Sequence, residues 1–376
     1  MIHSAHRRIV LEMLSLPTAP FVEGAVVAYL EAFCASRPGL KWERDRAGNV
    51  LVHLRRGRRR IQRPVCLTAH LDHPGFIAEE MTGPQRLRAI WRGGVRPEYF
   101  VGSRVRFHAE QRWIRGTVRS IKTYVENRIK RVSSAVIDVS APVPAGAPGM
   151  WDFPDATITA RHIRSRACDD LAGAAAMVCC MEEMTRRRLD GEAYFLFTRA
   201  EEVGFVGAIA ASRAETIPQQ CCVVAVETSS ELPSAPIGAG PILRVGDKAT
   251  VFHAGATAYC GAVATDLAAS DRRFTFQRKL MDGGTCESSA YCQFGYEATG
   301  LCLALGNYHN MNQKRQRTAP EYVGLGDFAS LVKWFVELAR ARRPYTGQDK
   351  DLLAKLARIE KQHRTVLRQT RTTPVY

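Results

Sequence analysis

The chain has 376 residues, enough for a large core and a second module. Its composition of 46% hydrophobic and 24% charged residues excludes a disordered polypeptide, and no apolar run approaches the length of a membrane span. The formal net charge of +16 raises nucleic-acid binding as a hypothesis, but the charge is spread along the chain without a nucleic-acid motif, which favours a basic solvated surface.

The N-terminus and the cysteines indicate the cellular compartment. Glu12 interrupts the early apolar stretch and no small-residue cleavage site follows, so we expect no signal peptide. The eleven cysteines include no C-x-x-C pair, which argues against a thiolate zinc site. Several lie inside apolar runs, namely Cys66, Cys179, Cys180, Cys221, Cys222 and Cys302. We therefore expect reduced, buried thiols in a cytoplasmic protein without a membrane partner.

The first predicted elements are a helix and a hairpin. Residues 23–35 have helical apolar spacing. Residues 41–54 (KWERDRAGNVLVHL) alternate as a strand does, with Gly48 at a turn, and residues 64–72 (PVCLTAHLD) form the predicted partner strand. The run RRGRRR, Arg55 to Arg60, is then the exposed turn of this hairpin, which we favour over a phosphate-binding patch.

Residues 75–159 have a different texture, rich in short β-like runs and without a long helix. The runs RLRAIW, SRVRFHA, IRGTVRSI and SAVIDVSA are separated by Gly, Pro and charged residues. We therefore predict an α/β domain formed by residues 1–74 and 160–345, a small β-rich domain of residues 75–159 inserted into it, and a basic C-terminal tail of residues 346–376.

Strands and helices alternate in the second half of the α/β domain. The segments are a helix within 166–191, a strand at 192–198, a helix at 203–214, a strand at 219–227, a strand within 297–310 and a helix at 326–343. The last helix has Asp327 as its predicted N-cap and basic residues in its last turn. This alternation predicts an α/β fold with a mainly parallel or mixed sheet covered by helices. The tail from Asp349 onward is basic and helical in pattern.

Candidate metal ligands share one structural position, just beyond the ends of predicted strands. They are His70 after VCLTA, Glu201 and Glu202 after YFLFT, Glu227 after CVVAV and His309 after GLCLALGNY. Asp169 and Asp170 lie on a loop that opens a helix and can face the same rim. Because the carboxyl ends of the strands in an open α/β sheet form one rim, these side chains are expected to converge there.

This set of ligands predicts a particular chemistry. Imidazoles combined with carboxylates suit Zn²⁺, Co²⁺ or Mn²⁺ rather than Ca²⁺. A bridging carboxylate allows two metal ions to lie roughly 3.5–4 Å apart, where they polarise a carbonyl and acidify a water molecule. A further carboxylate then takes the proton and passes it to the leaving amine. Glu201 and Glu202 can divide these roles. Taken singly, each residue is more simply a loop, surface or capping residue, so the joint pattern carries the prediction.

Five segments in this order resemble the co-catalytic zinc aminopeptidases related to glutamyl aminopeptidases and the tetrahedral aminopeptidases. The segments are TAHLDHPGF, RACDDLAGA, FTRAEEVGFVGA, VAVETSS and GNYHN. The upstream LPTAPFVEGAVVAYL and AGNVLV and the inserted WRGGVRPEYFVGSRVRF are also similar to that family. The resemblance extends to about Arg343 and implies a zinc exopeptidase-like fold, peptide substrates, and a dimer or an assembly of dimers.

The resemblance also implies a role for each matched residue. His70 and Glu227 would bind one metal ion, with Asp72 orienting His70. Glu202 and His309 would bind the other ion. Asp169 would bridge both ions and join Asp170 through a cis peptide, and Glu201 would be the general base. The inserted domain would form dimer contacts and shape substrate access.

Several positions depart from the family pattern and keep alternatives open. Glu227 stands where Asp is usual, and in wider relatives Glu at this place accompanies a carboxypeptidase or an N-acyl amino acid deacylase. Cys286 replaces an acid in GGTCES, with Glu287 beside it, and His73 and Pro74 also differ. A non-catalytic basic nucleic-acid-binding protein on a hydrolase scaffold is the alternative of another class. A glycosidase is disfavoured because adjacent glutamates cannot flank a sugar bond from two faces.

Overall fold

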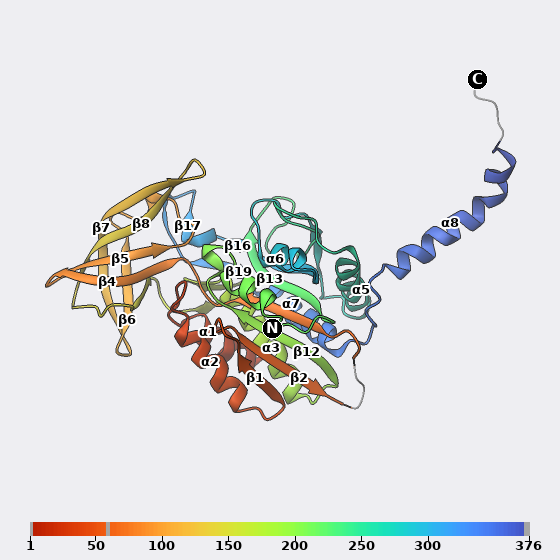
Figure 1. The fold of residues 1–376 in the computed structure, drawn as a ribbon, viewed down its shortest axis with the longest axis horizontal. Helices are drawn as coiled ribbons and strands as arrows, with labels where there is room; N and C mark the ends of the chain where they lie inside the picture. Colours follow the sequence, from red (N-terminus) through yellow and green to blue (C-terminus); the bar gives the residue numbers. More distant parts are fainter. Residues whose placement is uncertain (1–2, 58–60, 372–376) are drawn as a thin grey trace, which may run out of the picture.

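A computed structural model describes residues 3–57 and 61–371 and shows a mixed α/β fold with an attached β-barrel (Figure 1). Among the described residues, eleven strands form one sheet, whose main path runs β1-β2-β12-β3-β13-β16-β19-β11-β10, with β14 pairing to β16 and β15 to β14. The predicted fold class, a mixed sheet covered by helices with a small β-rich insertion, is confirmed.

The strands of the sheet come from the segments before and after the inserted barrel. They are β1 (Leu40–Arg44), β2 (Val50–Arg56), β3 (Val65–His70), β10 (Thr157–Ile158), β11 (His162–Ser165), β12 (Gly191–Thr198), β13 (Cys222–Ser230), β14 (Ile242–Arg244), β15 (Gln277–Lys279), β16 (Glu297–Gly306) and β19 (Glu321–Gly324). β3 pairs in parallel with both β12 and β13, and β13 pairs in parallel with β16. The carboxyl ends of these four central strands therefore lie at one rim.

Helices cover both faces of the sheet. One face packs against α1 (Ser4–Met13), α2 (Gly24–Ala35), α3 (Leu171–Arg186), α5 (Ala254–Ser270) and α7 (Leu325–Arg340), and the other against α4 (Val206–Arg213) and α6 (Glu287–Gln293). Successive residues of β13 divide between the two layers, because Val224 and Val226 belong to the first core and Val223 and Ala225 to the second. Burial on both faces explains why these strands are continuous apolar runs.

The insertion is a closed barrel with its own aromatic core. Its strands, in the order of the barrel, are β4 (Gly75–Gly83), β5 (Arg86–Arg92), β8 (Ile129–Val139), β7 (Arg112–Glu126), β6 (Arg104–Ala109) and β9 (Pro148–Trp151). Phe76, Trp91, Phe100 and Trp151 pack edge to face or tilted inside it. The short 3-10 helix η1 (Pro97–Tyr99) follows β5, and the barrel stands to one side of the large sheet (Figure 1).

The predicted hairpin between residues 41–54 and 64–72 is wrong. β2 pairs with β1 on one side, through a turn in which the Asp45 carboxylate accepts the Ala47 and Asn49 amides, and antiparallel with β12 on the other. β12 therefore separates β2 from β3. The cause is burial: β3 is covered on both faces and needs a hydrogen-bonded neighbour at both edges, which β12 and β13 supply. Arg55 and Arg56 belong to β2 rather than to a turn, and residues 58–60 of the run lie outside the described residues.

Asp327 is not the N-cap of the last helix of the α/β domain. The helix α7 begins at Leu325 with Gly324 at the N-cap position. The buried Asp327 carboxylate instead accepts the backbone N–H groups of Gly238 and Gly240, at 2.7 and 2.9 Å. The side chain therefore fastens a distant loop to the helix, a tertiary contact that local capping rules do not reveal.

The remaining elements complete the chain. A small ribbon pairs β17 (Met311–Asn312) with β18 (Arg317–Thr318), and the predicted helical tail is α8 (Lys350–Gln369). All eleven cysteines fall within the described ranges and are free thiols, ten of them buried, as predicted. No helix in residues 3–57 and 61–371 is long and apolar enough to cross a bilayer.

Candidate metal centre

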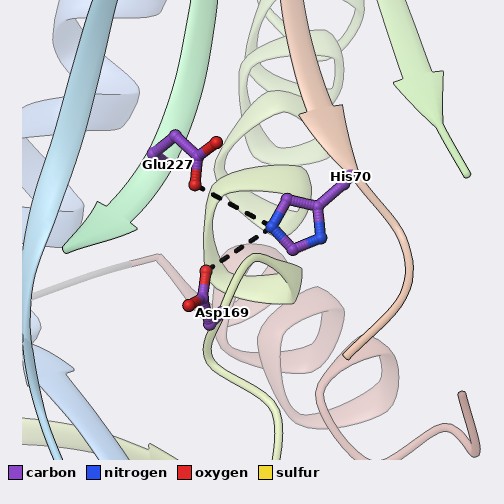
Figure 2. A group of neighbouring side chains, drawn as sticks. All are labelled: His70, Asp169 and Glu227. Carbon is purple, nitrogen blue, oxygen red and sulfur yellow. Dashed lines mark ion pairs between the residues drawn. The ribbon is translucent and has the colours of Figure 1, made fainter. Parts of the chain in front are cut away.

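The predicted ligands converge at the rim formed by the central strands. His70 ends β3, Asp169 precedes α3, and Glu202 lies in the 3-10 helix η2 (Glu201–Val203) that follows β12. His309 lies in η3 (Tyr308–Asn310) after β16. Glu227 lies inside β13 rather than beyond its end, yet its side chain points toward His70 and Asp169 (Figure 2).

Two groups of ligand atoms share Asp169. The His70 Nε2 atom lies 3.5 Å from Asp169 Oδ1 and 3.9 Å from Glu227 Oε2. The His309 Nε2 atom lies 3.5 Å from the other Asp169 oxygen, Oδ2, and 3.2 Å from Glu202 Oε1. In each group the ligand atoms lie within 4.8 Å of one another. Asp169 therefore stands between two imidazole-carboxylate pairs.

Both imidazole rings are oriented through their second nitrogen. The His70 Nδ1 atom lies 3.1 Å from the Asp72 carbonyl oxygen and 3.5 Å from its carboxylate. The His309 Nδ1 atom lies 2.9 Å from the carbonyl oxygen of Gly94, in the barrel segment after β5. With the proton on Nδ1, each ring donates a hydrogen bond to its carbonyl acceptor, and its Nε2 keeps a lone pair on the side of Asp169. This is the tautomer that a metal ligand requires.

The Asp72 carboxylate also fixes the backbone that carries the two glutamates. Its two oxygens accept the amide N–H groups of Glu201 and Glu202, at 2.9 and 3.1 Å. Asp72 is buried, so these hydrogen bonds are shielded from water. Asp72 thus fixes the position of the His70 ring relative to the backbone of Glu201 and Glu202.

Glu201 is positioned next to the first group of ligands. Its Oε2 atom lies 3.9 Å from His70 Nε2. Burial raises the pKa of Glu201 well above its usual value, against the influence of His70, and the neighbouring Glu227 and Glu202 carboxylates add to the rise. A carboxylate of raised basicity beside a reacting water is suited to accept a proton.

The electrostatics of the cluster fit cationic occupants. Among the described residues, the buried oxygens Asp169 Oδ1, Glu202 Oε1 and Glu227 Oε1 accept no hydrogen bond. Burial disfavours charged imidazoles, yet neighbouring carboxylates, Glu201 foremost for His70 and Glu202 for His309, raise the pKa of both rings well above the usual value. Acceptor oxygens without donors and a field that attracts protons are the conditions under which two divalent cations bind.

Sequence reasoning missed the network that supports the bridging residue. The peptide bond between Asp169 and Asp170 is cis, as the resemblance implied. Its carbonyl oxygen on Asp169 accepts from His73 Nδ1 at 2.6 Å, and the Glu321 carboxylate accepts the Cys168 and Asp169 amides. Glu321 follows no motif that the sequence analysis recognised, so no signal pointed to it.

Sequence reasoning also missed a buried cation in the pocket beside the ligands. Arg244, at the end of β14, is 4% exposed and lines the same pocket as Glu227 and the loop of residues 282–286. Its Nη1 atom lies 3.5 Å from Ser229 Oγ, and its Nε has no partner among the described residues. Among the described residues it forms no ion pair with a carboxylate. A buried guanidinium without a carboxylate partner is suited to an anionic group of a ligand.

Of the positions that depart from the family pattern, Cys286 lines this pocket and Glu287 lies behind it. The Cys286 amide donates to Asp247 Oδ2 at 3.0 Å, and the same oxygen accepts from Ser289 Oγ at 2.7 Å. The Glu287 carboxylate accepts from Thr198 Oγ1 at 2.6 Å, and burial raises its pKa to about 7. Asp247 thus anchors the pocket wall, and Glu287 lies in the support rather than in either ligand group.

Comparison with protein families and curated proteins gives two matches. The model of the M42 glutamyl aminopeptidase family matches residues 48–313, which contain every predicted ligand. A curated protein of Acetivibrio thermocellus named "Putative aminopeptidase" is 27% identical over 226 residues. That match covers 56% of this chain and 64% of the relative, so the chain spans somewhat less than two thirds of the relative's length.

Solved structures share the fold. An aminopeptidase from the archaeon Desulfurococcus kamchatkensis is 20% identical with a TM-score of 0.73, and the match covers 90% of this chain and 96% of that one. A TET peptidase from Pyrococcus horikoshii, which assembles into a tetrahedron or a large octahedral shell, is 19% identical with a TM-score of 0.72. That match covers 89% of this chain and 99% of the other. At this identity the likeness shows the fold alone.

Proposed function

Because the chain belongs to the M42 glutamyl aminopeptidase family, we propose that it is a metallo-aminopeptidase that removes N-terminal residues from peptides with the aid of two divalent cations, most suitably zinc. The observation that carries the proposal is the position of Asp169, whose two oxygens each lie 3.5 Å from a different imidazole. A carboxylate shared by two ligand groups is what a dimetal hydrolase needs.

The residues divide between two cation positions. His70, Glu227 and Asp169 would hold one ion, and His309, Glu202 and Asp169 the other. Such a set of two imidazoles and three carboxylates suits zinc, with cobalt or manganese as substitutes. When bound, the pair supplies positive charge that polarises the scissile carbonyl and acidifies a water molecule.

Glu201 would be the general base and Asp72 a positioning residue. Glu201 is held by its backbone amide on Asp72, which leaves its carboxylate free to face the reacting water. It would take a proton from that water and deliver it to the departing amine. Glu202, held by the same carboxylate, faces His309 instead, so the adjacent glutamates divide the two roles.

Arg244 supports an acidic preference in the substrate. The guanidinium is buried in the pocket beside Glu227 and has no carboxylate partner among the described residues. A carboxylate side chain on the N-terminal residue of a peptide would pair with it inside a desolvated pocket. The family description, glutamyl aminopeptidase, agrees with such a substrate.

The same arginine favours one alternative, a dimetal carboxypeptidase or N-acyl amino acid deacylase. Both of these enzymes recognise a free α-carboxylate, and Glu227 stands where the family resemblance leads one to expect Asp. The family match supports the aminopeptidase. The non-catalytic nucleic-acid-binding alternative is based on the +16 charge and on the Arg55 to Arg60 run, which lies partly outside the described residues.

Elemental analysis combined with blocked peptides tests the proposal. We expect two equivalents of metal per chain and hydrolysis of glutamyl peptides that have a free N-terminus and an amidated C-terminus. Acetylation of the N-terminus should abolish the reaction. Hydrolysis that survives acetylation but requires a free C-terminus would replace the aminopeptidase with the alternative.

Assembly and location belong to the same proposal. We infer a cytoplasmic homo-oligomer, a dimer or an assembly of dimers, in which the barrel of residues 75–159 forms contacts and narrows substrate access. The support is the fold shared with a TET peptidase that assembles into closed shells. Sedimentation of the purified chain, before and after deletion of the β7–β8 hairpin tip, measures the number of subunits and the contribution of the barrel.

A further inference from the structure

The helix α8 extends away from the rest of the molecule (Figure 1). Every residue of α8 is described by the structure, and each is exposed to solvent. The helix lies outside residues 48–313, which match the family model. It also contributes nothing to the metal centre, so the proposed peptidase activity does not account for it.

One face of α8 is apolar. Six large apolar side chains are between 45% and 68% exposed, namely Leu352, Leu353, Leu356, Ile359, Val366 and Leu367. Their spacing of three, four and seven residues places them on one side of a helix with 3.6 residues per turn. An exposed apolar stripe of this width is typical of a surface that binds a partner.

The opposite face of α8 is basic. Lys350, Lys361, Arg364 and Arg368 project from it and Arg358 flanks it, whereas Lys355 lies at the edge of the apolar stripe. With Asp351 and Glu360 as its only acidic residues, the segment 350–369 has a net charge of +4. Most of the cationic residues therefore lie away from the apolar stripe, while Glu360 and His363 fall within its arc.

Local interactions favour a helix at this position. The Asp349 carboxylate accepts the Leu352 amide at 2.9 Å, as an N-cap does. Glu360 pairs with Arg364, one turn later, through two hydrogen bonds of 2.7 and 2.5 Å. Caps and pairs alone leave an isolated helix of this length marginal in water, so a partner that covers the apolar face would stabilise it.

Three candidate partners differ in how they would cover the apolar and the basic face of α8. A second copy of α8 would cover the apolar face, but it would bring two helices of charge +4 together. A nucleic acid would neutralise the basic face and leave the apolar stripe in water. An anionic lipid surface satisfies both faces, because acyl chains cover the stripe and headgroups neutralise the flanking cations.

We propose that α8 is a membrane-surface anchor that lies in the plane of an anionic lipid bilayer, with its leucine-rich face buried at the boundary between headgroups and acyl chains. The helix does not span the bilayer, in agreement with the absence of a spanning helix among residues 3–57 and 61–371. A contact of α8 with the bilayer surface needs no spanning helix, but it differs from the sequence-based expectation that the protein has no membrane partner. It would hold the peptidase at the cytoplasmic face.

Co-sedimentation of the full chain with vesicles tests the proposal. The chain should bind vesicles that contain phosphatidylglycerol, bind pure phosphatidylcholine vesicles weakly, and dissociate as the salt concentration rises. The double variant Leu356→Gln/Ile359→Gln should bind about a hundredfold more weakly because it removes two buried aliphatic side chains. The double variant Lys361→Gln/Arg368→Gln should bind about thirtyfold more weakly to anionic vesicles only.

A matched control introduces the same residue on the opposite face. Ala354→Gln/Ala357→Gln adds two glutamines away from the apolar stripe and should bind like the parent chain. All variants lie on a helix without buried residues, so the melting temperature of the folded body should be unchanged. Equal binding by the apolar-face variant and the control would overturn the proposal. So would failure of the parent chain to bind anionic vesicles together with a subunit number that falls only in the apolar-face variant, which would identify a second copy as the occupant.

Discussion

Asp169 is the residue on which the candidate metal centre depends. It lies between His70 and His309, and its backbone is held by Glu321 and His73. Replacement by Asn keeps the size of the side chain and removes the negative charge that a bridging ligand supplies. The local geometry therefore predicts that the two cations are bound or lost together.

The first prediction concerns this shared ligand. Asp169→Asn should lower the metal content from two equivalents per chain to less than one, because both sites lose a ligand. Metal content is measured by elemental analysis after dialysis. Glu287→Gln, a buried carboxyl in the support that belongs to neither ligand group, is the control and should retain both ions. Two full equivalents in Asp169→Asn would exclude a bridging role.

The second prediction separates catalysis from metal binding. Glu201→Gln should reduce kcat by about 10²–10⁴-fold while two cations remain bound, because the variant loses a proton acceptor and keeps the hydrogen bond from its backbone amide to Asp72. Steady-state kinetics and elemental analysis on the same sample provide the two readouts. Unchanged kcat in the metal-loaded variant would falsify the assignment of Glu201 as the base.

The third prediction concerns substrate choice. Arg244→Met keeps approximate side-chain volume and removes the buried cation. It should lower kcat/KM for glutamyl peptides by about 10–100-fold, the loss expected for one charge-assisted hydrogen bond, and affect alanyl peptides far less. An equal loss with both substrates would assign Arg244 to the fold of the pocket instead of to recognition.

Most motif residues were predictable from the sequence because they lie at or just after the end of a strongly apolar strand. His70 and His309 are examples, since the rim of an open sheet collects whatever polar residue follows such a run. Arg244 was not predictable in this way: β14 has three residues, and it joins the sheet through antiparallel pairing with β16. His73 was noticed only as a departure from the family pattern, and its contact with the Asp169 carbonyl requires the folded backbone.

At the scale of elements, strand identity was predictable and strand neighbours were not. β12 and β16 coincide with the apolar runs singled out in the sequence. The insertion of β12 between β2 and β3 was missed because alternation and burial say whether a segment is a strand, not which strand lies beside it. Sequential pairing is common, and here the need of β3 for two parallel neighbours overrides it.

The fourth prediction belongs to α7. Asp327→Ala removes the acceptor of two buried backbone N–H groups and leaves both without a partner. It should destabilise the fold by about 2 kcal/mol or more, measured as the free energy of urea-induced unfolding. Asp349→Ala removes the N-cap of the fully exposed α8 and should change that free energy far less. Equal effects would mean that Asp327 contributes only to the helix terminus.

At the scale of the whole molecule, one sheet and one barrel build a single site. The ligands come from five separate segments of the sheet layer, and the barrel contributes the Gly94 carbonyl that orients His309. The general organisation was predictable from the change of texture at residue 75 and the return of α/β alternation. The contact between barrel and ligand was not, because it uses backbone atoms.

The fifth prediction concerns stability of the metal-free protein as a function of pH. Burial raises the pKa of Glu227 to about 8 and that of Glu287 to about 7, above the ordinary value of 4.5. At pH values between 4.5 and about 8 the folded chain retains protons that the unfolded chain has released. The free energy of unfolding therefore falls as pH rises toward 8. Divalent cations bind the deprotonated carboxylates and should oppose this loss.

Melting curves of chelated and zinc-loaded protein measure the effect. The difference in melting temperature between the two forms should widen from pH 5 to pH 8. A matched series on Glu287→Gln should show a shallower decline in the chelated form, because one of the protonated carboxyls is absent. A constant difference across this pH range would contradict the proposed burial of carboxyl groups at the cation sites.

The Gly94 carbonyl has a consequence for protein engineering. A peptide oxygen is present whatever side chain its residue bears, so the barrel is free to diverge in sequence while it keeps hold of the His309 ring. In a chimera with a foreign barrel, the hydrogen bond to His309 would therefore depend on loop length and backbone path, not on the amino-acid identity of the barrel. Excision of the barrel, by contrast, would release that ring and impair a cleft more than two hundred residues away along the chain.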